Sequence, residues 1–149
     1  MELKTFEEYL FGNVVKKATP NQARAKSLIE NSINRNDFLN QIIRAVKITE
    51  VNANFFIEQV YDILIELIRA KMLIDGFIAS GNYAHEAEVS YLRKLDFNEH
   101  NISLVNELRK FRNAVKYYGQ RYSKEEAENS VKFLNSILPK LKKMIENEK

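Results

Sequence analysis

The sequence predicts an all-α protein built as an up-and-down bundle of five to six helices. Its 149 residues include only 4 glycines and 2 prolines, too few for the turns of most β or α/β folds. Apolar residues recur at spacings of three and four through most of the chain, which is the period of an amphipathic helix. No long segment alternates between apolar and polar residues as a half-buried strand does.

The chain length fits one domain, residues 1–149, in which residues 1–19 are expected to form a peripheral N-terminal helix. The third helix is apolar around so much of its circumference that we expect it at the centre. The polar run 34–37 is expected to bend or break the second helix, and Pro139 to kink the last one. The first three expected helices are Thr5–Lys17, with Phe6 and Phe11 on its apolar side, a second from Asn21 into the forties, and Val51–Phe77. After a loop at 79–82, we expect helices at Tyr83–Leu95 and at Ile102–Tyr118, the second of which stops at Gly119. The last helix is expected to begin at a capping box formed by Ser123 and Glu126.

The composition excludes several kinds of chemistry. The absence of cysteine leaves no disulfide framework and no thiolate nucleophile. Two histidines, His85 and His100, are too few for a multi-histidine metal site, so we expect no metal and no cofactor. A net charge of +3 and a pI of about 9.0 permit a nucleic-acid partner without requiring one. No signal peptide or membrane-spanning run is visible, so we expect a cytoplasmic protein with no membrane partner.

The segment 108–119 is the most informative part of the sequence. On a helix whose apolar stripe is centred on Leu108, Arg112 lies about 40° away at about 100° per residue, at the border of the buried face. A guanidinium there needs a partner, because burying an unpaired charge is costly. One interpretation pairs it with a carboxylate of the long central helix, Asp62 or Glu66. The other leaves it for a phosphate, which its planar fork suits.

Arg112 and Asn113, followed by Tyr117, resemble the signature of the HEPN family: an arginine, often an asparagine beside it, then a histidine four to six residues on. The segment 76–92, with His85 inside it, also resembles the connection and short helix of archaeal-type members. The resemblance covers most of the chain and implies a HEPN-like bundle. It also implies metal-independent RNA cleavage by toxin or defence proteins, at a site built where two copies of the chain meet.

That chemistry explains the residue types. Cleavage by a ribose 2′-hydroxyl needs a cation for the charge on the phosphate oxygens and a group that moves a proton. By resemblance, the candidate catalytic residues are therefore Arg112, Asn113 and Tyr117.

Tyrosine stands where the family has histidine. Counted by the family spacing, the histidine position falls at Tyr117, Tyr118 or Gly119. A phenol with an ordinary pKa of about 10 is a poor base at neutral pH, and losing a positioned acid–base group costs about 10²–10⁴ in rate. We therefore expect weak or absent ribonuclease activity, with an active metal-independent endoribonuclease as the alternative. His85 and His100 are interpreted as surface or capping residues.

Arg112 and Tyr117 cannot face one small site from one regular helix, because residues five apart point about 140° apart. Either the helix breaks near Tyr117, or the site is shared with a second copy of the chain, and a homodimer is expected. Tyr117, Tyr118 and Tyr122 fit either a dimer interface or a platform on which RNA bases stack. The candidate RNA- or nucleotide-binding residues are Arg109, Arg112, Lys116, Tyr118 and Arg121.

The resemblance also implies a protein partner. In paired toxin–antitoxin modules of the family, a tyrosine just after the histidine accepts a nucleotidyl group from a partner nucleotidyltransferase, and Tyr118 or Tyr122 stands there in this chain. The sequence thus leaves three functions open: an RNA- or nucleotide-associated protein with such a partner, an active ribonuclease, and a non-catalytic structural or assembly dimer.

Overall fold

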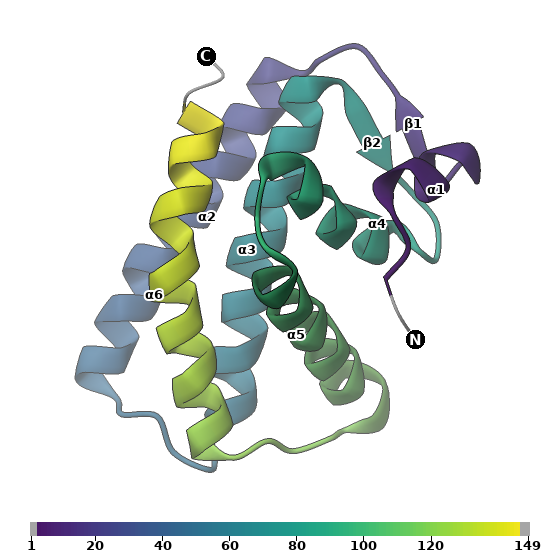
Figure 1. Ribbon diagram of the computed structural model, residues 1–149. Coiled ribbons are helices and arrows are strands. Elements are labelled where there is room, and N and C mark those ends of the chain that lie inside the picture. The colour runs from purple at the N-terminus through teal and green to yellow at the C-terminus, as the bar shows by residue number, and fades with distance from the viewer. Residues whose placement is uncertain (1–2, 147–149) are drawn as a thin grey trace.

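The computed structural model describes residues 3–146. Within them six α-helices pack together beside one small antiparallel sheet (Figure 1), which confirms the all-α prediction. The elements are α1 (Phe6–Phe11), β1 (Val15–Lys17), α2 (Gln22–Ala45), α3 (Ala53–Asp75), β2 (Phe77–Ala79), α4 (Ala84–Ser90), the 3₁₀ turn η1 (Tyr91–Leu95), α5 (Glu99–Tyr118) and α6 (Lys124–Glu146).

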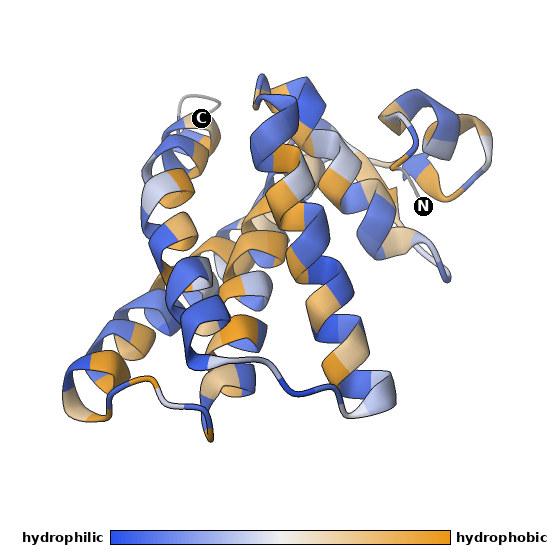
Figure 2. Ribbon diagram, turned by 60° about the horizontal axis from the view of Figure 1, so that its bottom comes forward, coloured by the Kyte–Doolittle hydropathy of each residue, from blue (hydrophilic) through white to orange (hydrophobic). Residues whose placement is uncertain are grey.

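Helix α3 is the centre of the molecule, as its sequence predicts. It packs against α2, α6, α5 and α4, and hydrophobic residues gather along it in Figure 2. Its apolar side chains are completely buried over more than two turns: Val60, Ile63, Leu64, Leu67 and Ile68. Burying such a side chain stabilises the fold by about 1.5–3 kcal/mol, so the core of the domain is built around this helix.

The small sheet corrects two predicted boundaries. The first helix ends at Phe11 rather than Lys17, and residues 15–17 instead pair with residues 77–79 in the register Lys16↔Ile78. The chain leaves the helix through Gly12 and Asn13, which has a φ of 62°. At the other end, Gly76 has a φ of 88°, a conformation that favours glycine. It stops α3 two residues before the predicted end at Phe77.

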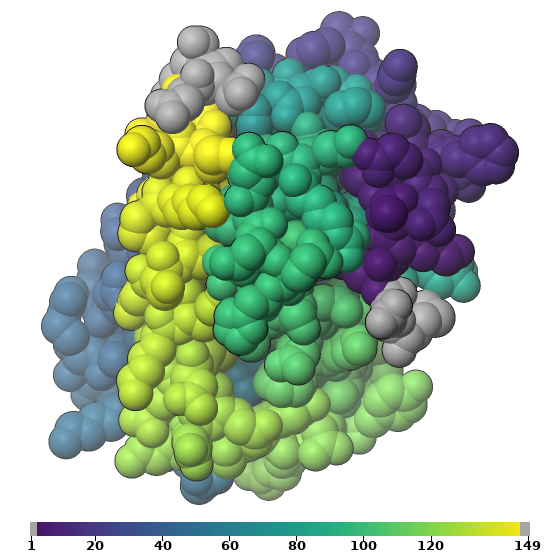
Figure 3. Space-filling view, in the orientation of Figure 1, coloured from purple at the N-terminus to yellow at the C-terminus, as the bar shows by residue number. Residues whose placement is uncertain are grey.

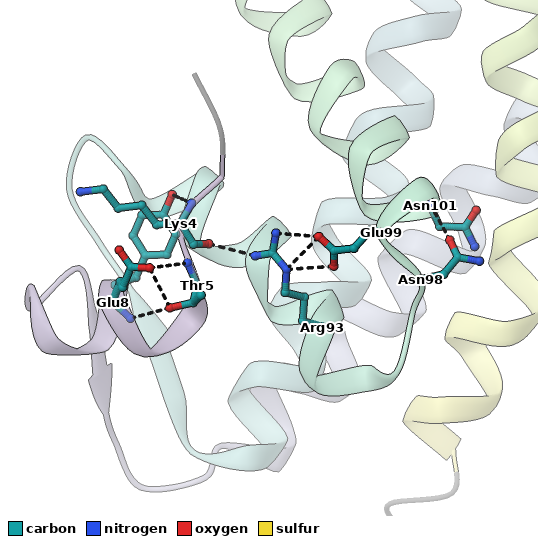
Figure 4. A network of polar contacts seen from close by, with 8 residues as sticks. Lys4, Thr5, Glu8, Arg93, Asn98, Glu99 and Asn101 are labelled. Carbon is teal, nitrogen blue, oxygen red and sulfur yellow. Dashed lines mark hydrogen bonds and ion pairs between the residues drawn. The ribbon is translucent and has the colours of Figure 1, made fainter.

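The N-terminal segment is fixed to the domain by its side chains. Phe6 is buried and meets Phe77 and Tyr91 edge-to-face, with ring centres 5.2 and 4.7 Å apart. Arg93 pairs with Glu99 at 3.0 Å and donates a hydrogen bond to the Lys4 carbonyl (Figure 4). Figure 3 shows this segment, in purple, lying against the green surface of the later helices.

Two predictions for this part of the chain turn out differently. Phe11, placed on the apolar side of the first helix, is 93% exposed because the helix ends there. Polar residues 34–37 do not break α2, which is continuous across them. One of them, Arg35, makes a polar contact with α3, since it pairs with Glu66 at 3.0 Å.

The ends of α5 and α6 follow the predicted signals. Gly119 ends α5 with a φ of 63°, and the capping box is present, because the Glu126 N–H donates to Ser123 Oγ and the Ser123 N–H donates to Glu126 Oε1. Pro139 lies inside α6, which continues through it to Glu146. None of the helices in residues 3–146 is long and apolar enough to cross a membrane.

Candidate functional site

Arg112 lies on α5 where that helix faces α3. Its Nε donates to Asp62 Oδ1 at 3.2 Å, so the predicted pairing with a carboxylate of the central helix is confirmed for Asp62. Its guanidinium carbon is also 5.9 Å from the centre of the Tyr61 ring. The side chain keeps 26% of its surface exposed, and neither Nη group has a hydrogen-bond partner among the described residues. Arg112 is thus held in place with half of its fork open to a ligand.

His85, at the start of α4, meets the same tyrosine. Its Nδ1 is 3.0 Å from the Tyr61 hydroxyl, and the two rings are stacked with centres 6.1 Å apart. Tyr61 is buried, and this burial raises its pKa above the ordinary value. His85 is exposed, as predicted for a surface histidine, but its contact with Tyr61 was not predicted. Sequence spacing gave no sign of it, because residues 61 and 85 belong to different helices.

Two further arginines lie around this pair and are already engaged. Arg69 makes a bidentate contact with the buried Glu88, at 2.6 and 3.0 Å, and this hydrogen bonding is the main cause of its raised pKa. Arg109 is buried, donates to Asn106 at 2.8 Å and lies 3.5 Å from Glu86. The structure therefore places Arg109, a candidate RNA-binding residue, inside the protein rather than on its surface.

These residues form one polar cluster at the junction of α3, α4 and α5, which we call the arginine–histidine cluster: Tyr61, Asp62, Arg69, His85, Glu86, Glu88, Arg109 and Arg112. Its three arginines face three carboxylates, so its fixed charges balance. Desolvation lowers the pKa of His85, and Arg69, Arg112 and Arg109 lower it further against the opposing effect of Glu88. The cluster thus combines a largely neutral imidazole with one partly open guanidinium.

The other candidate residues lie at the end of α5. The helix is regular through Tyr118, which removes the predicted break near Tyr117, so Arg112 and Tyr117 do not face one site within a single chain. Tyr117 and Tyr118 are 67% and 85% exposed, and the ammonium of Lys116 lies 5.4 Å from the centre of the Tyr117 ring. Asn113, the remaining candidate of the signature, is half-buried.

The connections that precede α3 and α6 lie together at this end of the bundle (Figure 1). Asn54 joins them, because its amide donates to the Gln120 carbonyl at 2.8 Å and accepts from the Tyr122 N–H at 2.9 Å. Tyr122 stacks on Phe111 at 4.6 Å and belongs to the packing rather than to the open surface. The exposed group at this end, which we call the aromatic–basic end, consists of Val51, Phe55, Lys116, Tyr117, Tyr118 and Arg121.

Residues 3–146 contain no group of three or more histidine, cysteine, aspartate or glutamate side chains that could hold a metal ion. No family model matches the chain, and no match is found among the curated proteins or the solved structures. The HEPN resemblance therefore stays a prediction from the sequence.

Proposed function

We propose that this chain is a HEPN-like, RNA-associated protein of the cytoplasm that binds single-stranded RNA along the outer side of α5. The observation that carries the proposal is the aromatic–basic end. There the exposed Tyr117 and Tyr118 follow Lys116 at the end of the helix that carries the half-open Arg112, and the exposed Arg121 lies in the connection after that helix. Exposed aromatic rings supply faces on which bases stack, and cations beside them contact the phosphates.

The dimensions of α5 suit such a ligand. Tyr118 lies six positions after Arg112, about 9 Å along the helix axis and about 120° around it at about 100° per residue. A single strand that reaches both therefore follows the curve of the helix, from the guanidinium at the border with α3 to the stacking surface at the exposed end. Arg109 is not part of this surface, because its guanidinium already contacts Asn106 and Glu86.

Cleavage by Tyr117 is not part of the proposal. The phenol is exposed at the helix end and lies about 140° around the helix from Arg112, at about 100° per residue. A ribonuclease that used Arg112, Asn113 and Tyr117 of one chain would be slow, so we propose binding as the main activity of this surface.

A homodimer is a further part of the proposal. Residues 111–115 of α5 are half-buried, and they include the apolar Val115. A second copy packed there in a twofold arrangement would bring Tyr117 of the partner subunit towards Arg112.

A second candidate function is that of a nucleotidyl acceptor for a partner nucleotidyltransferase. The exposure of the Tyr118 side chain, 85%, favours it, since a modifying enzyme needs an open hydroxyl. Intact-mass and peptide analysis of the protein purified from its native cells tests it: a nucleotidyl adduct on Tyr118 supports this function, and unmodified Tyr118 in cells that contain the enzyme contradicts it.

Binding of a fluorescein-labelled, unstructured RNA, followed by anisotropy, tests the main proposal. The double variant Lys116→Ala/Arg121→Ala is expected to weaken binding and to flatten its salt dependence by about 0.7 per lost phosphate contact. The matched control is Lys132→Ala/Lys143→Ala, which removes two exposed lysines of α6 and is expected to bind as the natural protein does. Equal loss in both double variants, or no binding by the natural protein, would overturn the proposal.

A further inference from the structure

A cavity of about 450 Å³ lies between α5 and the N-terminal segment, a volume within the range of small-molecule sites. Lys110, on its wall, lies about 160° around α5 from Arg112 at about 100° per residue, so the cavity opens on a different face of that helix. We propose that it binds the carboxylate of a small organic acid with an apolar body. The α5 residues that line it share one face of the helix: Glu99, Ile102, Ser103, Asn106 and Lys110.

Asn106 lines the cavity with an unused hydrogen-bond donor. The residue is only 9% exposed, and its Oδ1 accepts a hydrogen bond from Nε of Arg109 at 2.8 Å. Because a guanidinium can only donate, this contact fixes which end of the amide faces Arg109. The other end, Nδ2, has no hydrogen-bond partner among residues 3–146. Leaving a nearly buried donor unpaired is costly, and an acceptor in the cavity supplies the missing bond.

Two further donors come from the same face of α5. Lys110 lies four positions after Asn106, and because helical side chains lean towards the N-terminus, its ammonium extends along the cavity towards the amide. Ser103 lies three positions before Asn106 and adds a hydroxyl. Within the described residues, neither the Lys110 ammonium nor the Ser103 hydroxyl has a partner. An ammonium, an amide and a hydroxyl thus line the cavity without acceptors of their own.

The other charges of the cavity are already balanced. Arg93 contacts Glu99 through Nε and Nη2, each at 3.0 Å, and its Nη1 donates to the Lys4 carbonyl (Figure 4). Lys110 is therefore the unpaired charge of the described lining. A ligand with a single negative charge matches it, whereas a doubly charged phosphate monoester also meets the Glu99 carboxylate.

A carboxylate fits this set of groups. Its two oxygens offer about four acceptor positions, enough for the ammonium, the amide and the hydroxyl, and hydrogen bonds between charged groups are the strong ones. Ile102 is 2% exposed and Leu3 is half-buried, so both provide an apolar surface for the rest of the ligand. Together these features define the ligand as a small monocarboxylate with an apolar body.

Benzoate is the test probe, because it joins one carboxylate to an apolar ring, and benzamide is its uncharged counterpart. The ¹⁵N-labelled protein is titrated with each at pH 7 and constant ionic strength, and the amide signals are followed by NMR. We expect benzoate to shift the signals of residues 102–110 and benzamide to bind about tenfold more weakly. Lys110→Met, which removes the charge, is expected to weaken benzoate binding by a similar factor. The matched control Lys132→Met, on α6, is expected to bind benzoate as the natural protein does.

Three results would overturn the proposal: unchanged signals at residues 102–110, equal binding of benzoate and benzamide, or unweakened binding by Lys110→Met. Inorganic phosphate is titrated as a competitor, and tighter binding of phosphate than of benzoate would contradict the assignment to a carboxylate. The amide spectrum of Lys110→Met also shows whether the variant is folded. Because the titration contains no RNA, its result is independent of the proposed RNA binding.

Discussion

At the scale of single residues, each charged side chain that is buried within residues 3–146 is in contact with a partner. Glu88 is 3% exposed and is matched by Arg69, and Arg109 lies between Asn106 and Glu86. Arg112 differs from both, since only its Nε is engaged and its side chain remains partly open. Three arginines in one cluster thus divide into two that hold the helices together and one that is available to a ligand.

Removal of the buried Glu88 carboxylate tests whether Arg69 holds the helices together. Glu88→Ala leaves Arg69 without its partner and is expected to lower the free energy of unfolding by about 2–3 kcal/mol, below the usual loss for a broken buried pair because Arg69 keeps some contact with water. Glu99→Ala breaks the exposed pair with Arg93 and should cost much less. Urea unfolding of both variants provides the comparison, and equal losses would contradict the account.

His85 gives the fold a specific pH dependence. Because its pKa is lower in the folded than in the unfolded state, the unfolded chain binds more protons below about pH 6.5, and stability falls as the pH falls. Thermal unfolding between pH 7.5 and 5.5 should show this fall in the natural protein and in His100→Gln. His85→Gln should show less of it, and an unchanged pH dependence in His85→Gln would contradict the assignment.

At the scale of elements, the turns decide what the helical pattern leaves open. Gly76 ends α3 and starts β2, and a Cβ on it would lie 2.9 Å from the Ala18 carbonyl oxygen. The sheet of residues 15–17 and 77–79 thus depends on a close approach of two backbones that are distant in the sequence.

Two glycine variants distinguish the cost of backbone strain from the cost of a steric clash. Gly76→Ala adds both a strained φ and a clash, whereas Gly81→Ala, with a φ of 85°, meets open space and adds strain alone. We expect Gly76→Ala to cost about 1–3 kcal/mol and Gly81→Ala less, as measured by chemical unfolding. A larger loss at Gly81 would show that the contact with Ala18 is unimportant.

The long helices were predictable because their information is local. Residues three and four positions apart identify α3 as a helix. In the same local way, the capping box at Ser123 marks the start of α6 and Gly119 marks the end of α5. The two strands could not be predicted, since each is three residues long and is held by a partner about sixty positions away. The Asp62 contact of Arg112 was predictable from helix geometry, but the His85–Tyr61 contact depends on the angle between α3 and α4.

At the scale of the whole molecule, the exposed Phe55, Tyr117 and Tyr118 lie at one end of the bundle, next to the half-buried residues 111–115 of α5. The homodimer proposed there predicts a protein twice the mass of one chain in sedimentation equilibrium at micromolar concentration. Val115→Lys places a charge on the half-buried face and is expected to release monomers that remain folded. A natural protein that is monomeric throughout this range would remove the shared-site arrangement and leave RNA binding to the single chain.

The measurement that tests the central claim most directly is photo-crosslinking of a 4-thiouridine RNA to the natural protein, with the attached peptides identified by mass spectrometry. Single-stranded RNA bound along the outer side of α5 predicts crosslinks at Tyr117 and Tyr118, and their loss in the Lys116→Ala/Arg121→Ala variant. Crosslinks confined to α2 and α6, or spread evenly over the surface, would contradict the account.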